Sequence, residues 1–284
     1  MILLIPFLIA FFGSLISGLY DLKTTEIPDY VPNFMILFGI GYYFLIGILT
    51  HNFYYFEKSL EFGFLSYFFG FFLFVFGQWG EGDARLLAGI SFLLPFHPFF
   101  QTYFPFPLIF VFNLFLVGTV YMLIYAFVFS LLRSKKIFSI FKNEIKKRKK
   151  ILTSFFVLIF IFLSSISYFL SILLGIRFSF DFVFLSIFSS LSIILLYLIF
   201  LFSKTVEKFG FIKRISVKKL KEGDVLLENK IWIGLTKKEI EKLKKSGKKF
   251  VYIKEGVRFG LAFFLALIFS IYFPEIFFFI NYIF

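Results

Sequence analysis

Long apolar runs constrain this chain more than any other feature, because they recur along most of its length. Several approach or exceed the roughly 20 residues that a helix needs to cross a bilayer core of about 30 Å. Backbone polar groups cannot face lipid unpaired, so these runs are predicted to be helices. Since 60% of the 284 residues are hydrophobic, one soluble core would not bury so much apolar surface. The sequence therefore predicts an all-α polytopic membrane protein.

Eight transmembrane helices are expected. The first run begins directly after Met1, with no basic region before it and no small-residue cleavage site behind it, so we interpret it as a retained span. The fourth run is short and contains glycine, which favours a helix packed inside protein. The expected spans are Ile2–Tyr20, Val31–Leu49, Phe62–Phe76, Ala84–Phe96, Phe106–Leu132, Leu152–Leu174, Phe182–Phe202 and Phe259–Ile283.

The basic residues orient these spans. Eight alternating crossings place 28 of the 30 Lys and Arg residues on one side, and only Lys58 and Arg177 on the other. Cytosolic loops carry the excess of positive charge, so the larger set is predicted to be cytosolic. Both termini are then predicted to be extracytosolic, and the protein is expected in the plasma membrane. We interpret the basic segment Arg133–Lys150 as a loop that anchors this topology at lipid headgroups, and we expect membrane lipids but no nucleic acid as partners.

A polar segment before the last span has the pattern of a small folded unit. The run "DVLLENKIWIGL" predicts a hairpin, and "KFVYIK" predicts a third strand. Between them, Thr236 and Glu239 form a capping-box pattern for a helix that Gly247 can end. We therefore expect a cytosolic α+β insert at 203–257, between a membrane core at 1–202 and a C-terminal transmembrane helix at 258–284.

Metal and cofactor chemistry has little support in the sequence. There is no cysteine, which removes disulfides and thiolate zinc sites, and neither His51 nor His97 belongs to an H-E-x-x-H pattern. We expect no metal and no cofactor.

Acidic residues gather at the predicted cytosolic ends of the early spans. An acid within a span costs roughly 2.5–3.5 kcal/mol on insertion scales, so acids at a membrane boundary need an explanation. Asp21 ends the first span, and Asp83 follows the third and opens the fourth. Odd-numbered spans descend to the cytosol, so the two aspartates are predicted to reach the same face. Two close carboxylates can share a proton, one acting as general base on a water while the other polarises a peptide carbonyl.

Two glycines precede the second aspartate. Gly80 and Gly82 would allow the chain near Asp83 to bend and to approach an extended substrate closely. The alternative is that Gly-x-Gly-Asp is a turn and Asp83 an N-cap of the next helix.

Together, "DLKTTEIPD" after the first span and "GEGD" after the third resemble the prepilin peptidase family, which are GxGD-type intramembrane aspartic proteases. The lysine-rich, cysteine-free chain is similar to the archaeal branch that processes preflagellins and other class III signal peptides. The resemblance covers roughly Ile2 to Pro95 and is looser over the insert. It implies cleavage of the short basic leader of prepilin- or preflagellin-like precursors at the cytosolic membrane face.

The resemblance also implies roles for individual residues. Asp21 and Asp83 match the two catalytic aspartates, and Gly80 and Gly82 match the glycines of the second motif. The residues that match the motif around the first aspartate are Lys23, Ile27 and Pro28. Bacterial relatives also methylate the new N-terminus and often carry paired cysteines, which this chain lacks, so we expect no methyltransferase activity.

Three further acids, Glu26, Asp29 and Glu81, admit two interpretations. They would attract the basic residues of a leader, or they would stabilise helix N-termini and pair with Lys23 and Arg85.

Two functions of other classes also stay open. One is a transporter that uses Asp21 and Asp83 as a cation or proton relay, although such sites usually lie near the bilayer midplane between repeats. The other is a non-catalytic membrane scaffold, for which replacing either aspartate by asparagine would be harmless.

Overall fold

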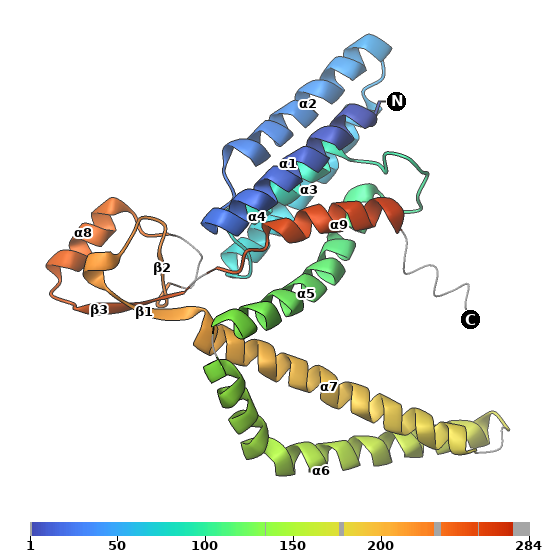
Figure 1. Ribbon diagram of the computed structural model, residues 1–284. Helices are drawn as coiled ribbons and strands as arrows, with labels where there is room; N and C mark the ends of the chain where they lie inside the picture. The colour runs from blue at the N-terminus through green and yellow to red at the C-terminus, as the bar shows by residue number, and fades with distance from the viewer. Residues whose placement is uncertain (1, 134, 176–178, 230–233, 255, 275–284) are drawn as a thin grey trace. The chain divides into compact units, whose positions relative to one another are not determined.

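The computed structural model is dominated by helices that follow the apolar runs of the sequence (Figure 1). It describes residues 2–133, 135–175, 179–229, 234–254 and 256–274. The expected class, a helical polytopic membrane protein with a small α+β insert, is confirmed. The helices at the eight expected spans are α1 (Leu4–Thr24), α2 (Tyr30–Thr50), α3 (Tyr54–Val75), α4 (Glu81–Leu93), α5 (Phe106–Arg133), α6 (Lys135–Leu173), α7 (Phe180–Gly210) and α9 (Gly260–Tyr272).

Six of these helices are long and apolar enough to cross a membrane, counted over the described residues: α1, α2, α3, α5, α6 and α7. The other two, α4 and α9, have 13 residues each in the described part of the chain. The expected last span ran to Ile283, and its end from residue 275 lies outside the described residues.

Several predicted boundaries were wrong because charged residues also continue helices. α3 begins at Tyr54 rather than Phe62, with Glu57 in its first turn. The basic segment expected as a loop forms the first half of α6 from Lys135. Lys, Arg and Glu are good helix formers, and Glu144 pairs along the helix with Lys147 and Arg148.

The chain forms two compact units, one made of residues 1–122 and 213–284 and the other of residues 123–212. The second unit contains the helical hairpin of α6 and α7, which pack against each other. Their contact face includes buried serines such as Ser171 on α6 and Ser190 on α7.

From Lys213 on, the insert belongs to the first unit and folds around its own apolar cluster. Its expected first residues, 203–210, are part of α7. Three strands, β1 (Ile212–Ser216), β2 (Val225–Leu226) and β3 (Phe250–Lys254), form a sheet in the order β1-β3-β2. β2 and β3 are antiparallel, with Val225 opposite Lys254. A short 3-10 turn η1 (Val217–Lys219) and helix α8 (Lys237–Lys245) complete it.

The sequence predicted most of this insert but not all of it. The Thr236–Glu239 capping box is present, and Gly247 adopts a positive φ of 73° just after α8. The third strand is β3 as expected, whereas β1 was not predicted. The second half of the expected hairpin, at 230–233, lies outside the described residues.

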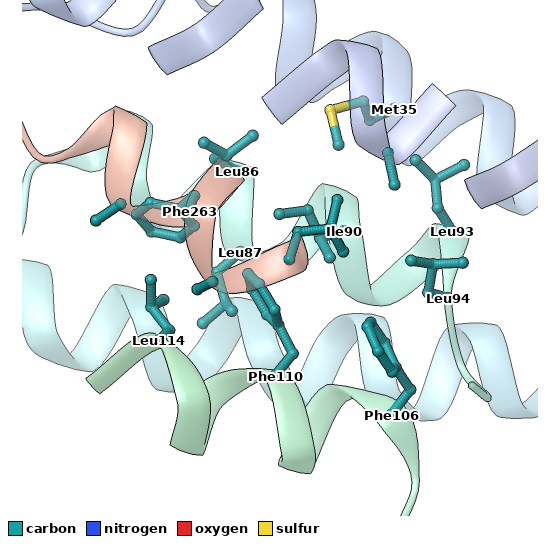
Figure 2. Close-up of a cluster of buried hydrophobic side chains, with 14 of the residues drawn as sticks. Met35, Leu86, Leu87, Ile90, Leu93, Leu94, Phe106, Phe110, Leu114 and Phe263 are labelled. Carbon is teal, nitrogen blue, oxygen red and sulfur yellow. The ribbon is translucent and has the colours of Figure 1, made fainter. Parts of the chain in front are cut away.

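Helix α4 lies at the centre of the first unit, in contact with α1, α2 and α3. Figure 2 shows its leucine and isoleucine side chains between Met35 of α2, Phe263 of α9 and three residues of α5. Those three, Phe106, Phe110 and Leu114, are spaced four apart and so share one face of α5. The high apolar content of α4 is explained by this burial, since all its residues from Leu86 to Leu93 are buried.

Both ends of α4 are held by polar groups. The last carbonyls of a helix have no partner within it. In α4 the hydroxyl of Tyr43 donates to the Leu93 carbonyl at 2.6 Å, and the hydroxyl of Ser59 donates to the Phe92 carbonyl at 2.6 Å. The other end carries the Gly80–Asp83 motif.

Candidate active site

Asp21 lies on the last turn of α1, on a face made of small residues. The buried positions of this helix include Ser14, Ser17 and Gly18, which recur at helical spacing. Their small size lets α9 approach closely, because a Cβ on Gly18 would lie 2.8 Å from the Cα of Leu261. Asp21 is 5% exposed, and its carboxylate accepts the backbone N–H of Gly260 at 2.6 Å. The first aspartate is therefore held by the beginning of the last helix.

Asp83 is the third residue of α4, and its carboxylate turns back to the start of that helix. It accepts the backbone N–H of Gly80 at 2.9 Å. This bond satisfies one of the N–H groups that a helix start leaves unpaired. Asp83 thus stabilises the N-terminus of α4, as in the interpretation of Gly-x-Gly-Asp as a helix cap. It does so from the third helical position, whereas the N-cap residue is Gly80.

Asp83 lies outside the six long apolar helices, and its pKa is raised to about 7. The main cause is burial of the carboxyl group, which disfavours the charged form. The N–H of Gly80 opposes this rise, while the neighbouring Asp21 adds to it. Asp21 is thus close enough to Asp83 for its charge to raise the pKa of that group.

The two sequence motifs meet where the loop after α1 packs against the start of α4. A Cβ on Gly82 would lie 2.9 Å from the Cβ of Ile27, so a side chain here would displace the loop that follows Asp21. Asp29, at the end of that loop, forms an ion pair of 2.9 Å with Arg85 of α4. Glycine is thus needed at position 82 for close approach between the two motifs.

The expectation that both glycines bend the chain is not what the backbone shows. Gly80 has a φ of −79°, which any residue adopts, and Gly82 is part of α4. The bend before the motif is instead at Gly77, whose φ of 70° favours glycine and ends α3. At Thr25 a φ of 64° ends α1 and starts the loop to Asp29.

The remaining predicted residues lie around this loop. Arg85 pairs with both Glu81 and Asp29, which agrees with the interpretation of these acids as ion-pair partners. Lys23 and Glu26 are exposed, and Pro28 is half-buried. Of the three acids proposed to attract a basic leader, Glu26 alone is not part of the ion pairs formed by Arg85 among the described residues.

Three residues at this site were not anticipated. Gly260 binds Asp21, Arg258 lies close enough for its charge to act on Asp21, and Trp79 packs against Phe259 and Phe263 next to Gly80. One signal was available in the sequence. The last span begins on the predicted cytosolic side, so its first residues reach the same depth as Asp21.

Comparisons with known proteins agree with this arrangement. Residues 7–130 match the type IV leader peptidase family. A 92-residue segment is 37% identical to a preflagellin peptidase of Methanocaldococcus jannaschii, covering 32% of this chain and 39% of that relative. The match therefore spans about two fifths of the relative's length.

Proposed function

Since residues 7–130 match the type IV leader peptidase family, we propose that the chain is a membrane aspartic endopeptidase of the GxGD type. Its substrates would be prepilin- or preflagellin-like precursors with a short basic leader. The observation that carries this proposal is the contact between the loop after α1 and the start of α4, with Ile27 against Gly82 and Asp29 paired with Arg85. These contacts bring Asp21 and Asp83 into electrostatic range at the ends of their helices.

The chemistry follows from two carboxyl groups with one proton between them. One carboxylate takes a proton from a water molecule, whose oxygen attacks the peptide carbonyl carbon. The protonated partner donates to the carbonyl oxygen and stabilises the charge that develops there. The raised pKa of Asp83 supports this role, because it keeps a fraction of that group protonated near neutral pH.

The location of the reaction is also part of the proposal. In the predicted topology, 28 of the 30 Lys and Arg residues lie on the same side as Asp21, so we assign this side to the cytosolic face of the plasma membrane and both termini to the opposite side. The basic first half of α6 would contact anionic lipid headgroups. A leader with positive charges would remain on this face while the apolar segment behind it stays in the membrane.

The dyad is tested with purified protein in detergent and a peptide that carries a basic leader before an apolar helix. Asp21→Asn and Asp83→Asn are each expected to lower cleavage by about 10²–10⁴-fold, with cleavage followed by mass spectrometry. Asp181→Asn is the matched control, since Asp181 is an exposed acid in the first turn of α7. Persistent cleavage in both aspartate variants would refute the dyad. Ion flux into vesicles without any cleavage would favour a transporter instead.

Recognition of the leader is tested at Glu26, because Asp29 and Glu81 already pair with Arg85. Glu26→Lys is expected to raise KM for a basic-leader peptide several-fold, and added salt should shrink this difference. Glu57→Lys, a charge reversal at an exposed position of α3, is the control. An unchanged KM in Glu26→Lys would end the recognition role of this acid.

A further inference from the structure

The beginning of α9 contacts the elements that carry both aspartates, although it lies outside the region that matches the family. The N–H of Gly260 donates to Asp21 at 2.6 Å across a separation of 239 residues. This group is one of the unpaired N–H groups at a helix start, where the helix dipole also favours a negative charge. The contact therefore stabilises the ionised form of Asp21.

The approach between α1 and α9 is too close for any side chain at two positions. A Cβ on Gly260 would lie 2.9 Å from the Cβ of Asp21 and 3.1 Å from its Oδ2 atom. One turn earlier, Gly18 faces the Leu261 backbone at a similar distance. Asp21 thus lies where the backbones of α1 and α9 are in close contact, which leaves its carboxylate little freedom to move.

The same turn of α9 also contacts the residue before the second motif. Phe263 packs edge-on against Trp79 with ring centroids 5.5 Å apart, and Phe259 lies 6.2 Å from it. Trp79 is buried and immediately precedes Gly80, whose N–H holds Asp83 at 2.9 Å. One helical turn therefore fixes Asp21 directly and the start of α4 through an aromatic contact.

Helix α5 holds this turn in place. The hydroxyl of Tyr121 donates to the Arg258 carbonyl at 2.7 Å, and the ring of Phe259 fits where Gly118 has no side chain. Both contacts fix the backbone just before Gly260, the residue that binds Asp21.

Arg258 adds a positive charge to this arrangement. It is half-buried, and its Nε donor is buried without a hydrogen-bond partner within the described residues. An unpaired buried donor is costly, so this N–H group is available to donate to a partner at the site. Two charged groups act on Asp21: Arg258, which lies two residues before the first residue of α9, and Asp83 of α4. Asp83 itself has one backbone donor and a like charge nearby.

We propose that Arg258 and Gly260 are positioning residues of the catalytic pair, which keep Asp21 ionised as the general base and leave the shared proton on Asp83. This inference rests on the proposed peptidase function and assigns a separate role to each aspartate. Asp21 takes a proton from water while the water oxygen bonds to the peptide carbon, and Asp83 gives its proton to the carbonyl oxygen. As the gem-diol collapses, the C–N bond breaks, Asp21 gives its proton to the leaving nitrogen, and Asp83 regains one from a hydroxyl of the gem-diol.

The test compares pH–rate profiles of the full-length protein with a basic-leader peptide. Arg258→Gln is expected to move the acid limb of kcat/KM upward by up to about one pH unit, because the ionised form of Asp21 loses a nearby opposite charge. Arg258→Lys should restore much of the wild-type profile. Lys248→Gln removes a positive charge from an exposed site of the insert and should leave the profile unchanged.

Gly260→Ala tests the backbone contact separately. Its added Cβ is expected to displace Asp21 and to lower kcat by on the order of 10²-fold, with a smaller change in KM. Gly41→Ala is the matched control, because a Cβ at Gly41 would meet nothing within 4 Å. Size-exclusion chromatography and thermal unfolding exclude variants that fail to fold.

The outcomes separate this inference from the proposed function. If wild-type protein does not cleave the peptide, or if both aspartate-to-asparagine variants still do, the peptidase dyad itself fails. If the dyad holds but folded Arg258→Gln and Gly260→Ala keep the wild-type rate and pH profile, only the role of α9 is overturned.

Discussion

Two groups of helices in this chain use their apolar residues in opposite ways. In the most apolar stretch of α1, 39% of the residues are buried, whereas the corresponding values are 6% in α6 and 11% in α7. The helices around the candidate site bury small residues, such as Gly63, Ser66 and Gly70 on α3. The α6–α7 hairpin instead exposes large side chains, among them Phe162 and Leu196.

This difference distinguishes helices that pack closely against one another from helices that mainly face lipid. Apolar side chains gain nothing from leaving lipid for protein, so association in a bilayer depends on close packing of small residues and on hydrogen bonds. The α1–α4 and α9 region has such contacts and also holds both aspartates. The hairpin has few of them, and its exposed aromatic surface suits contact with lipid.

The largest loss of cleavage and stability is expected when a close contact between helices near the site is filled by a side chain. A Cβ on Gly70 would lie 2.8 Å from the Cα of Ala84, directly after Asp83. Gly70→Leu is therefore expected to lower peptide cleavage by about 10²-fold and stability by on the order of 1–3 kcal/mol. Cleavage kinetics and thermal unfolding in detergent measure the two effects.

The control for this change is Ser165→Leu, at an exposed position of α6. It should alter neither cleavage nor unfolding appreciably, because a leucine there replaces a smaller side chain at an open surface. Equal losses in the two variants would contradict the distinction between the two groups of helices.

Sequence reasoning worked best where the bilayer restricts the possibilities. The apolar runs predicted the helices, and the depth argument placed Asp21 and Asp83 on the same face, in agreement with the electrostatic effect of Asp21 on Asp83. Boundaries failed at α3 and α6, because helices continue into charged residues where no hydropathy signal marks an end.

Contacts between distant segments could not be read from the sequence in the same way. The bond between Gly260 and Asp21 depends on which helices are neighbours, and neither periodicity nor charge encodes that pairing. Likewise, Gly82 was predicted to bend the chain, whereas its importance is the space that it leaves for Ile27.

The next prediction concerns pH and the environment of Asp83. Its pKa of about 7 lies above the ordinary value of 3.8, so the folded state binds this proton more tightly than the unfolded state. The stability that results is fully present below pH 3.8 and is lost as the pH rises through about 7. If Asp83 acts as the acid, cleavage should also fall above pH 7, by about tenfold per unit, as the protonated form disappears.

Thermal unfolding of Asp83→Asn checks this effect without relying on activity. The variant should gain stability relative to wild type at pH 8, by on the order of 1 kcal/mol or more, and the gain should shrink toward pH 4. Asp181→Asn on the exposed first turn of α7 should follow wild type at both pH values. A constant difference between Asp83→Asn and wild type across this range would contradict the raised pKa.

A smaller effect on activity is expected when the hairpin itself is overpacked. Ser190 is fully buried on α7, and its hydroxyl donates to the Ser186 carbonyl at 2.6 Å. Ser190→Leu should destabilise the α6–α7 unit by about 1–3 kcal/mol, yet leave kcat within about twofold of wild type. A large loss of kcat in a folded Ser190→Leu protein would show that the hairpin takes part in the reaction.

The smallest effect is expected in the insert, where a helix start can be weakened without touching either group of membrane helices. Thr236 caps α8: its backbone N–H donates to Glu239 at 2.8 Å, and its hydroxyl accepts the N–H of Glu239. Thr236→Ala should cost about 1 kcal/mol, because the hydroxyl is lost while the backbone bond remains. Thr236→Ser keeps the hydroxyl and serves as the control, with hydrogen exchange at α8 as the readout.

If exchange becomes faster only in α8 and cleavage is unchanged, any role of the insert in cleavage does not depend on this helix. A parallel loss of cleavage would instead connect the insert to α9, which follows β3 after a few residues and holds Asp21.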